Sequence, residues 1–176
     1  MADINPAYDD EILAKAAEHL KKEGSVQLNE ILVPSALRSF QNLKWKHLYN
    51  PLKFALHYSR PPEVWKEFQK LVSKLIGKKV NCGMWCIAMM PGDYSVLYDS
   101  LKPGKGFIFM FDLNAVPENC GGYTVLLKGD REVARVVPKS NSFTIVNQAG
   151  LKVFHKYLNH HAKHPRIFLC GVALAK

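Results

Sequence analysis

The chain has 176 residues, enough for one domain with a sizeable hydrophobic core. Hydrophobic residues make up 48% of it and charged residues 22%, which is typical of a soluble globular protein. No apolar run is long enough to cross a membrane, and the polar, acidic N-terminus differs from a signal or transit peptide. We therefore expect an intracellular, cytoplasmic protein without a membrane partner.

The formal net charge of +9 is distributed unevenly along the chain. Residues 1–40 carry 7 acidic and 4 basic residues, whereas residues 41–176 carry 8 acidic and 20 basic residues. A basic surface of this kind suits an acidic partner, which can be a protein, RNA, the ribosome or an anionic small molecule. A solvated lysine-rich surface with no partner is the alternative explanation.

The four cysteines do not form a metal or disulfide pattern. Cys82 and Cys86 are not spaced like the ligands of a zinc ribbon, and Cys120 and Cys170 have no near partner. Three of the four lie in apolar runs, where a cysteine packs as a small hydrophobic residue. The sequence therefore predicts buried free thiols.

The first 76 residues carry mainly helical patterns. An apolar stripe predicts a helix over Asp9–Glu23, with Asp9 or Asp10 as its N-cap and Gly24 as its stop. The elements predicted next are a short strand, a helix beginning at a proline, and a helix opened by two prolines and ended by a glycine: Val26–Leu32, Pro34–Leu43 and Pro61–Gly77. The segment Lys44–Ser59 shows no clear periodicity.

After Gly77 the pattern changes to short β-like runs separated by turn residues. The predicted strands are Asn81–Met90, Tyr94–Tyr98, Phe107–Leu113, Tyr123–Leu127, Glu132–Val137, Ser142–Asn147, Val153–Leu158 and Arg166–Leu174. Regularly spaced short strands are typical of a sandwich or a jelly-roll barrel. We expect an α+β fold in a single domain, 1–176, with a helical buttress over 1–76 and a jelly-roll core over 77–176.

Six segments of the second half carry motifs in a fixed order: Gly92–Ser100, Phe107–Asn114, Gly121–Leu126, Val137–Val146, Val153–Lys156 and Arg166–Gly171. Together they resemble the double-stranded β-helix core of the Fe(II)- and 2-oxoglutarate-dependent oxygenases, prolyl-hydroxylase type. The resemblance covers roughly residues 77–175. It implies Fe(II) and 2-oxoglutarate as cofactors if the site is functional.

The resemblance also shows where the metal site departs from the family pattern. These enzymes bind iron with two histidines and one carboxylate. In the register that fits best, Tyr98 and Ser100 take the positions of the His-x-Asp pair, and His155 takes that of the second histidine. A register shifted by one places Leu97 and Asp99 there and turns the opposite faces inward. The candidate metal ligands are therefore His155, Asp99 and Tyr98, although His155 can equally be a strand histidine and Asp99 a turn residue.

Arg166 occupies the position of the arginine that binds the distal carboxylate of 2-oxoglutarate in the family, where a guanidinium pairs with both oxygens. The serine expected two residues later is Phe168. Tyr94, which follows Gly92 and Asp93 in the first motif, is the second candidate for a cofactor contact. The alternative for Arg166 is an ordinary arginine that follows a His-Pro turn.

Two further clusters permit a functional and a structural interpretation. The histidines of residues 160–164 can bind a metal or lie in an exposed loop. Trp45, His47 and Tyr49, with lysines around them, can stack on RNA or form a basic edge with buried aromatic rings.

Three functions are compatible with the sequence. The first is a catalytically inactive relative that binds a protein or RNA, indicated by Tyr98, Ser100 and Phe168. The second is an active 2-oxoglutarate-dependent dioxygenase with altered metal ligands. The third is a barrel without iron in which Arg166 binds a small carboxylate.

Overall fold

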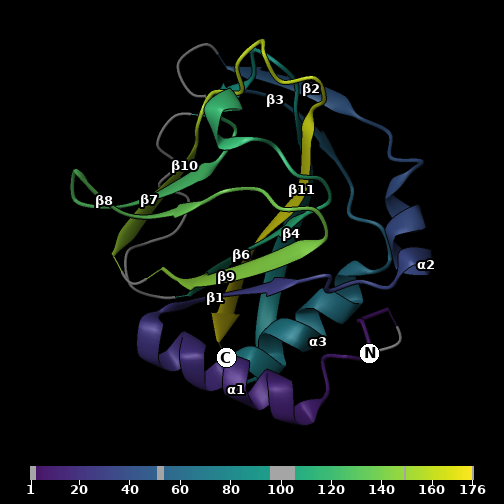
Figure 1. The fold of residues 1–176 in the computed structure, drawn as a ribbon, viewed down its shortest axis with the longest axis vertical. Coiled ribbons are helices and arrows are strands. Elements are labelled where there is room, and N and C mark those ends of the chain that lie inside the picture. Colours follow the sequence, from purple (N-terminus) through teal and green to yellow (C-terminus); the bar gives the residue numbers. More distant parts are fainter. Residues whose placement is uncertain (1–2, 51–53, 96–105, 149, 176) are drawn as a thin grey trace.

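The computed structural model describes residues 3–50, 54–95, 106–148 and 150–175, in which antiparallel strands form two sheets (Figure 1). The larger sheet has the order β1-β9-β6-β11-β4-β3-β2, with β5 also paired to β3, and the smaller sheet has the order β10-β7-β8. The strands of the larger sheet are β1 (Ser25–Asn29), β2 (Lys46–Asn50), β3 (Phe54–Ser59), β4 (Val80–Met89), β5 (Tyr94–Ser95), β6 (Phe107–Asp112), β9 (Ser142–Asn147) and β11 (Arg166–Ala175). Those of the smaller sheet are β7 (Thr124–Lys128), β8 (Arg131–Val136) and β10 (Leu151–His155).

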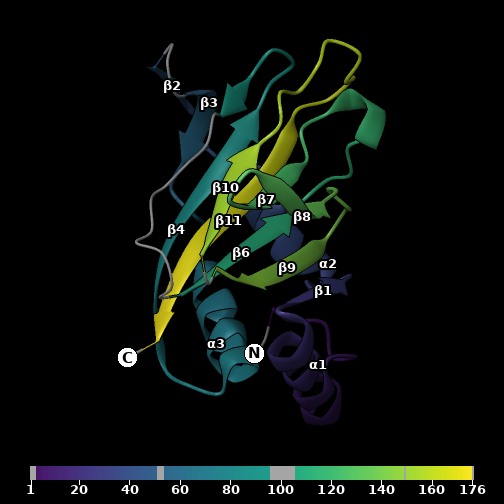
Figure 2. The ribbon, with the colours of Figure 1, turned by 90° about the vertical axis from the view of Figure 1, so that its left-hand side faces the viewer.

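Helices α1 (Asp10–Glu23) and α3 (Trp65–Ile76) lie side by side at one end of the molecule, whereas β2 and β3 lie at the other end (Figures 1 and 2). The predicted N-cap of α1 is confirmed, because the Asp9 side chain accepts a hydrogen bond from the backbone N–H of Ile12 at 2.9 Å. The predicted stop is confirmed too, since Gly24 adopts the left-handed conformation at φ 78°. None of the described helices is both long and apolar enough to span a membrane.

The two faces of the larger sheet pack against different layers. On β6, Phe109 and Phe111 face the helices and join the main core with Phe68 of α3. The alternate residues Ile108 and Met110 face the smaller sheet and pack with residues of β7, β8 and β10. Strand β6 at the centre of the larger sheet is therefore buried on both faces, with the helices on one side of it and the smaller sheet on the other. This is the α+β architecture that the sequence predicts.

The strands after Gly77 begin and end within about three residues of their predicted bounds wherever the structure describes them. The helix expected over Pro34–Leu43 is shorter and divides into α2 (Pro34–Leu37) and the 3-10 turn η1 (Arg38–Phe40). Residues 44–59, in which no periodicity is visible, contain β2 and β3. Four of the five residues of β2 are exposed, so this edge strand has no alternation of buried and exposed positions that would identify it.

Candidate functional site: the barrel interior around Arg166

The side chains of Arg166 and His155 meet between the two sheets. Arg166 begins β11 and lies two residues before Phe168, which pairs with Asp112 at the end of β6. His155 ends β10 and pairs with Thr124 at the start of β7. Because paired residues and residues two apart on a strand share a face, all five side chains point into the same interior.

Arg166 is fully buried and makes a fixed set of contacts within the chain. Its Nε donates to Oδ1 of Asp112 at 2.8 Å. Its Nη1 donates to the carbonyl oxygen of Gly122 at 2.8 Å and to Oγ1 of Thr124 at 2.9 Å. The centre of the guanidinium lies 4.1 Å from the centroid of the Phe168 ring. The arginine is thus held by β6, β7 and its own strand at the same time.

Asp112 is as completely buried as Arg166. Burial raises the pKa of the Asp112 carboxyl, and the neighbouring guanidinium charge opposes that rise. Asp112 Oδ2 and Arg166 Nη2 are both buried and have no hydrogen-bond partner within the described part of the chain. The ion pair therefore compensates the desolvation of both groups through a single charge-assisted hydrogen bond.

His155 extends this network within the smaller sheet, from β7 to β10. Its Nδ1 lies 2.9 Å from Oγ1 of Thr124, the same hydroxyl that accepts from Arg166. Its ring meets the Phe168 ring edge to face, with centroids 4.9 Å apart. Burial, together with the nearby Arg166 charge, lowers the pKa of His155 to about 3. The imidazole is therefore neutral across the physiological pH range.

The remaining lining around Arg166 is apolar. Phe168 is fully buried and packs in a cluster with Met89, Leu158 and the partly buried Cys170. Burial raises the pKa of the Cys170 thiol to about 12, so this sulfur stays protonated and behaves as a small hydrophobic group. All four cysteines are free thiols, as predicted, with Cys86 and Cys120 buried and the other two partly buried.

Of the residues predicted to bind a cofactor or metal, the structure brings Arg166 and His155 together through Thr124 and Phe168. Tyr94 lies half-buried in β5, which pairs with β3 and approaches β10. The candidate ligands Tyr98 and Asp99, with Ser100 and Leu97 of the competing registers, lie outside the described residues. In residues 3–50, 54–95, 106–148 and 150–175, no three His, Cys, Asp or Glu side chains are placed to share a metal ion.

The sequence analysis missed Asp112 and Thr124. Asp112 ends the apolar strand Phe107–Asp112, and a carboxylate in such a run is a signal that it requires a buried partner. Its partner Arg166 lies 54 residues later, which no local pattern reveals. The histidines of residues 160–164 occupy an exposed loop between β10 and β11, as one of the two interpretations predicts.

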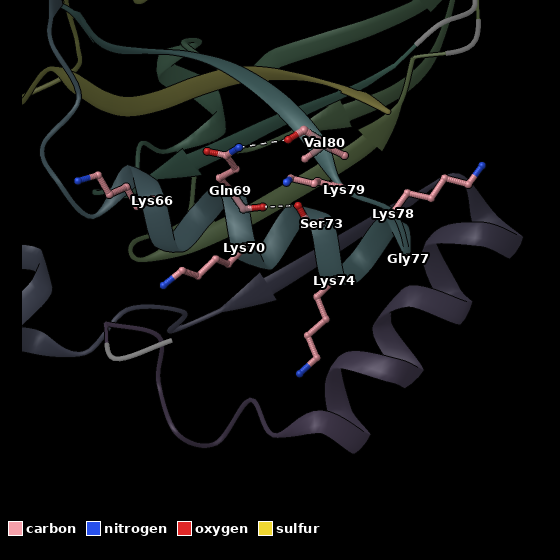
Figure 3. A pocket seen from close by; sticks show the side chains of 9 residues that line it. All are labelled: Lys66, Gln69, Lys70, Ser73, Lys74, Gly77, Lys78, Lys79 and Val80. Atoms are coloured by element: carbon pink, nitrogen blue, oxygen red, sulfur yellow. Dashed lines mark hydrogen bonds between the residues drawn. The ribbon is translucent and has the colours of Figure 1, made fainter. Parts of the chain in front are cut away.

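A shallow pocket lies outside the barrel, along α3 and the start of β4 (Figure 3). Five lysines line it: Lys66, Lys70, Lys74, Lys78 and Lys79. The first three form ion pairs with Glu63, Glu67 and Asp10 respectively. This pocket therefore presents less positive charge than its lysines suggest, and it is separate from the network around Arg166.

Comparisons with known proteins show similarity in structure alone. No family model and no curated protein sequence matches the chain. Among solved structures, a prolyl-4-hydroxylase from Pseudomonas putida is 14% identical with a TM-score of 0.69, over 93% of this chain and 99% of that one. A prolyl hydroxylase from Trichoplax adhaerens, in complex with a peptide fragment of the hypoxia inducible factor, is 14% identical with a TM-score of 0.64, over 94% and 90%.

A 2OG-Fe(II) oxygenase family oxidoreductase from Burkholderia pseudomallei is 11% identical with a TM-score of 0.65, over 92% of this chain and 90% of that one. These similarities extend over nearly the whole of both chains. At such low identity they establish the fold and leave the chemistry open. The chain has the double-stranded β-helix fold of the Fe(II)- and 2-oxoglutarate-dependent oxygenases.

Proposed function

We propose that this chain is a non-catalytic protein that uses the oxygenase fold to bind a protein or RNA partner. The observation that carries the proposal is the buried ion pair between Arg166 and Asp112. An arginine that serves a carboxylate ligand must keep its guanidinium available to that ligand. Here Nε and Nη1 are used within the chain, and the aromatic ring of Phe168 covers the guanidinium.

The described residues do not fit 2-oxoglutarate at this position. A ligand carboxylate at Arg166 would lie beside the Asp112 carboxylate, and two like charges in a dry interior repel each other strongly. The free Nη2 does not relieve this repulsion, because it belongs to the same guanidinium that already compensates Asp112. Binding would therefore require Asp112 to take up a proton or the ion pair to break.

The iron side of the site supports the same proposal. The described residues supply His155 as a neutral imidazole, which is the form that binds metals. One imidazole alone is a weak iron site, because the family chemistry needs three protein ligands on one face of the metal. The alternative function, an active dioxygenase that combines His155 with Asp99 or Tyr98, predicts the opposite result in the experiment below.

We also infer an intracellular, cytoplasmic setting for this function. Four cysteines that are all free are typical of proteins that stay in a reducing compartment. The net charge of +9 favours an acidic partner there.

An anaerobic titration with Fe(II) and 2-oxoglutarate tests the proposal. We expect no visible charge-transfer band, no heat of 2-oxoglutarate binding, and no oxygen uptake dependent on 2-oxoglutarate. The Pseudomonas putida prolyl-4-hydroxylase, assayed in parallel, serves as the positive control. Any turnover that disappears in His155→Gln, which keeps a polar side chain and removes the imidazole, would establish the active enzyme and overturn the proposal.

A further inference from the structure

The end of the molecule remote from α1 and α3 gathers three segments that are distant in sequence (Figures 1 and 2). They are the pair β2 and β3, the turn at residues 90–93 after β4, and the loop at residues 156–165 between β10 and β11. We call the aromatic side chains that these segments present the ring surface; it consists of His47, Tyr49, His57, Tyr157 and His160.

Three members of the ring surface form a row across β2 and β3. His47 and Tyr49 lie two residues apart on β2, so they share a face, and their rings are stacked with centroids 6.2 Å apart. His47 pairs across the strands with His57, and these two rings lie 4.7 Å apart. Tyr49 is 63% exposed, the highest exposure among the large hydrophobic side chains of the described residues. The row therefore ends in an open aromatic face on an edge strand.

A tight turn connects this row to the other two rings. Asp93 is buried, and its Oδ2 lies 3.3 Å from Nδ1 of His57 and accepts a hydrogen bond from the backbone N–H of Met90 at 2.8 Å. On the other side, the backbone N–H of Gly92 donates to the carbonyl oxygen of Leu158 at 2.7 Å. The turn is thus bound to β3 and to the loop at 156–165, so both groups of rings have a common support.

The second group is a hydrogen-bonded pair. The hydroxyl of Tyr157 lies 3.0 Å from Nε2 of His160, with the two rings edge to face. His160 in turn lies next to Gly92, where an added Cβ would be 3.7 Å from its Cε1. Both side chains are exposed. The ring surface therefore continues from β2 over the turn to this loop.

The segments that carry the ring surface are themselves positively charged. Residues 31–62 contain five Lys or Arg and no Asp or Glu, and residues 133–176 contain seven Lys or Arg and no Asp or Glu. The exposed cations on these segments or within two residues of them are Lys44, Lys46, Arg60, Lys156 and Lys163. Within the turn, the one carboxylate, Asp93, is buried against His57. The described part of these segments thus exposes aromatic rings and cations but no carboxylate.

We propose that the ring surface binds single-stranded nucleic acid, with unpaired bases stacked on Tyr49 and its neighbours and phosphates paired with the surrounding cations. Stacking of a base on an exposed aromatic side chain contributes about 1–3 kcal/mol and accepts any base. The lysine-lined pocket on α3 lacks this combination, because it has no aromatic side chain and three of its lysines are paired with acidic residues. This inference rests on the proposed function, because it specifies the partner that the proposed function leaves as a protein or RNA. Stacking of bases on the rings does not depend on whether the chain binds iron.

Fluorescence anisotropy with labelled 12-nucleotide single strands of RNA and DNA of the same mixed sequence tests the inference, with the matching duplex as a control. We expect single strands to bind more tightly than the duplex, and the RNA and DNA arms decide which is preferred. Tyr49→Ala should raise Kd by about 5- to 100-fold, and Tyr49→Phe should bind like the wild type. Circular dichroism checks that the exposed substitution leaves the fold intact.

A matched pair of lysine variants separates this surface from general charge attraction. Lys46→Ala, beside the rings, should reduce the slope of log K against log salt by about 0.7, and Lys78→Ala, in the turn between α3 and β4, should leave it unchanged. Equal binding of the duplex, an unchanged Kd for Tyr49→Ala, or tighter binding of a glutamate-rich peptide in the same assay would overturn the inference. Those results leave the proposed absence of catalysis intact, because the titration with Fe(II) and 2-oxoglutarate tests that separately.

Discussion

Replacing Arg166 by methionine removes a buried guanidinium that donates three hydrogen bonds, to Asp112, Gly122 and Thr124. The variant leaves the Asp112 carboxylate buried without its counter-charge and the Gly122 carbonyl without this donor. Breaking a buried ion pair by removal of one partner costs about 3–5 kcal/mol, and each unpaired neutral acceptor adds about 1–3 kcal/mol. We expect Arg166→Met to lower the free energy of unfolding by about 4 kcal/mol or more.

The double variant Arg166→Met/Asp112→Leu removes both charges and fills the space with apolar atoms. It should be more stable than Arg166→Met alone, because no uncompensated charge stays buried. Asp112→Asn, which keeps an oxygen for Nε, is the milder third variant, with an expected loss of about 1–3 kcal/mol. Urea unfolding followed by circular dichroism measures all of them.

The reasoning depends on the coupling between the two residues. Strictly additive losses in the double variant would show that Arg166 and Asp112 do not stabilise each other. A loss below about 1 kcal/mol for Arg166→Met would show that the guanidinium is not held in the interior. Either result would also remove the observation on which the proposed function rests.

Two further predictions follow from the same region. With the pKa of His155 near 3 in the folded protein and near 6.5 in the unfolded chain, the unfolded state binds more protons between these values, so stability falls as the pH falls. The loss should reach about 3 kcal/mol by pH 4 in urea titrations, and His155→Gln should abolish it; an identical profile in that variant would contradict the assignment. Gly121, at φ 73°, lies so close to the Tyr157 carbonyl oxygen that an added Cβ overlaps it. The melting temperature of Gly121→Ala should therefore be well below that of Gly129→Ala, because at Gly129 φ is 61° and no atom lies within 4 Å of an added Cβ. Equal melting temperatures of the two variants would refute the clash.

The strands after Gly77 could be predicted because most are apolar runs separated from one another by turn residues. Ser142–Asn147 agrees with its predicted bounds at both ends. The pair β2 and β3 could not, since β2 is an edge strand whose side chains are exposed on both faces. Strand prediction depends on an alternation of apolar and polar residues, which arises when one face of a strand is buried. Because neither face of β2 is buried, its sequence lacks that alternation.

The sequence allowed the strands that carry Arg166 and His155 to be predicted, but not the ion pair that occupies the guanidinium of Arg166. The resemblance placed Arg166 at the start of one strand and His155 within another, and in the structure Arg166 begins β11 while His155 ends β10. That Arg166 would be neutralised within the chain depends on Asp112, which only the pairing of β6 with β11 brings to it. Sequence patterns report the period of a strand, whereas the identity of its cross-strand neighbours is a property of the folded sheet.

The place of β11 in the larger sheet has a consequence for how the chain folds. This strand is the last of the described strands along the chain, yet it lies between β4 and β6 and forms hydrogen-bonded pairs with both. During synthesis, the edges of β4 and β6 that pair with β11 stay unpaired, and their apolar faces stay exposed, until Arg166–Ala175 has left the ribosome. Closure of the sheet then needs contacts between residues as distant as Val80 and Ala175, which slows folding through the entropy of loop closure. A chaperone that shields strand edges would therefore act on this protein between the synthesis of β6 and that of β11.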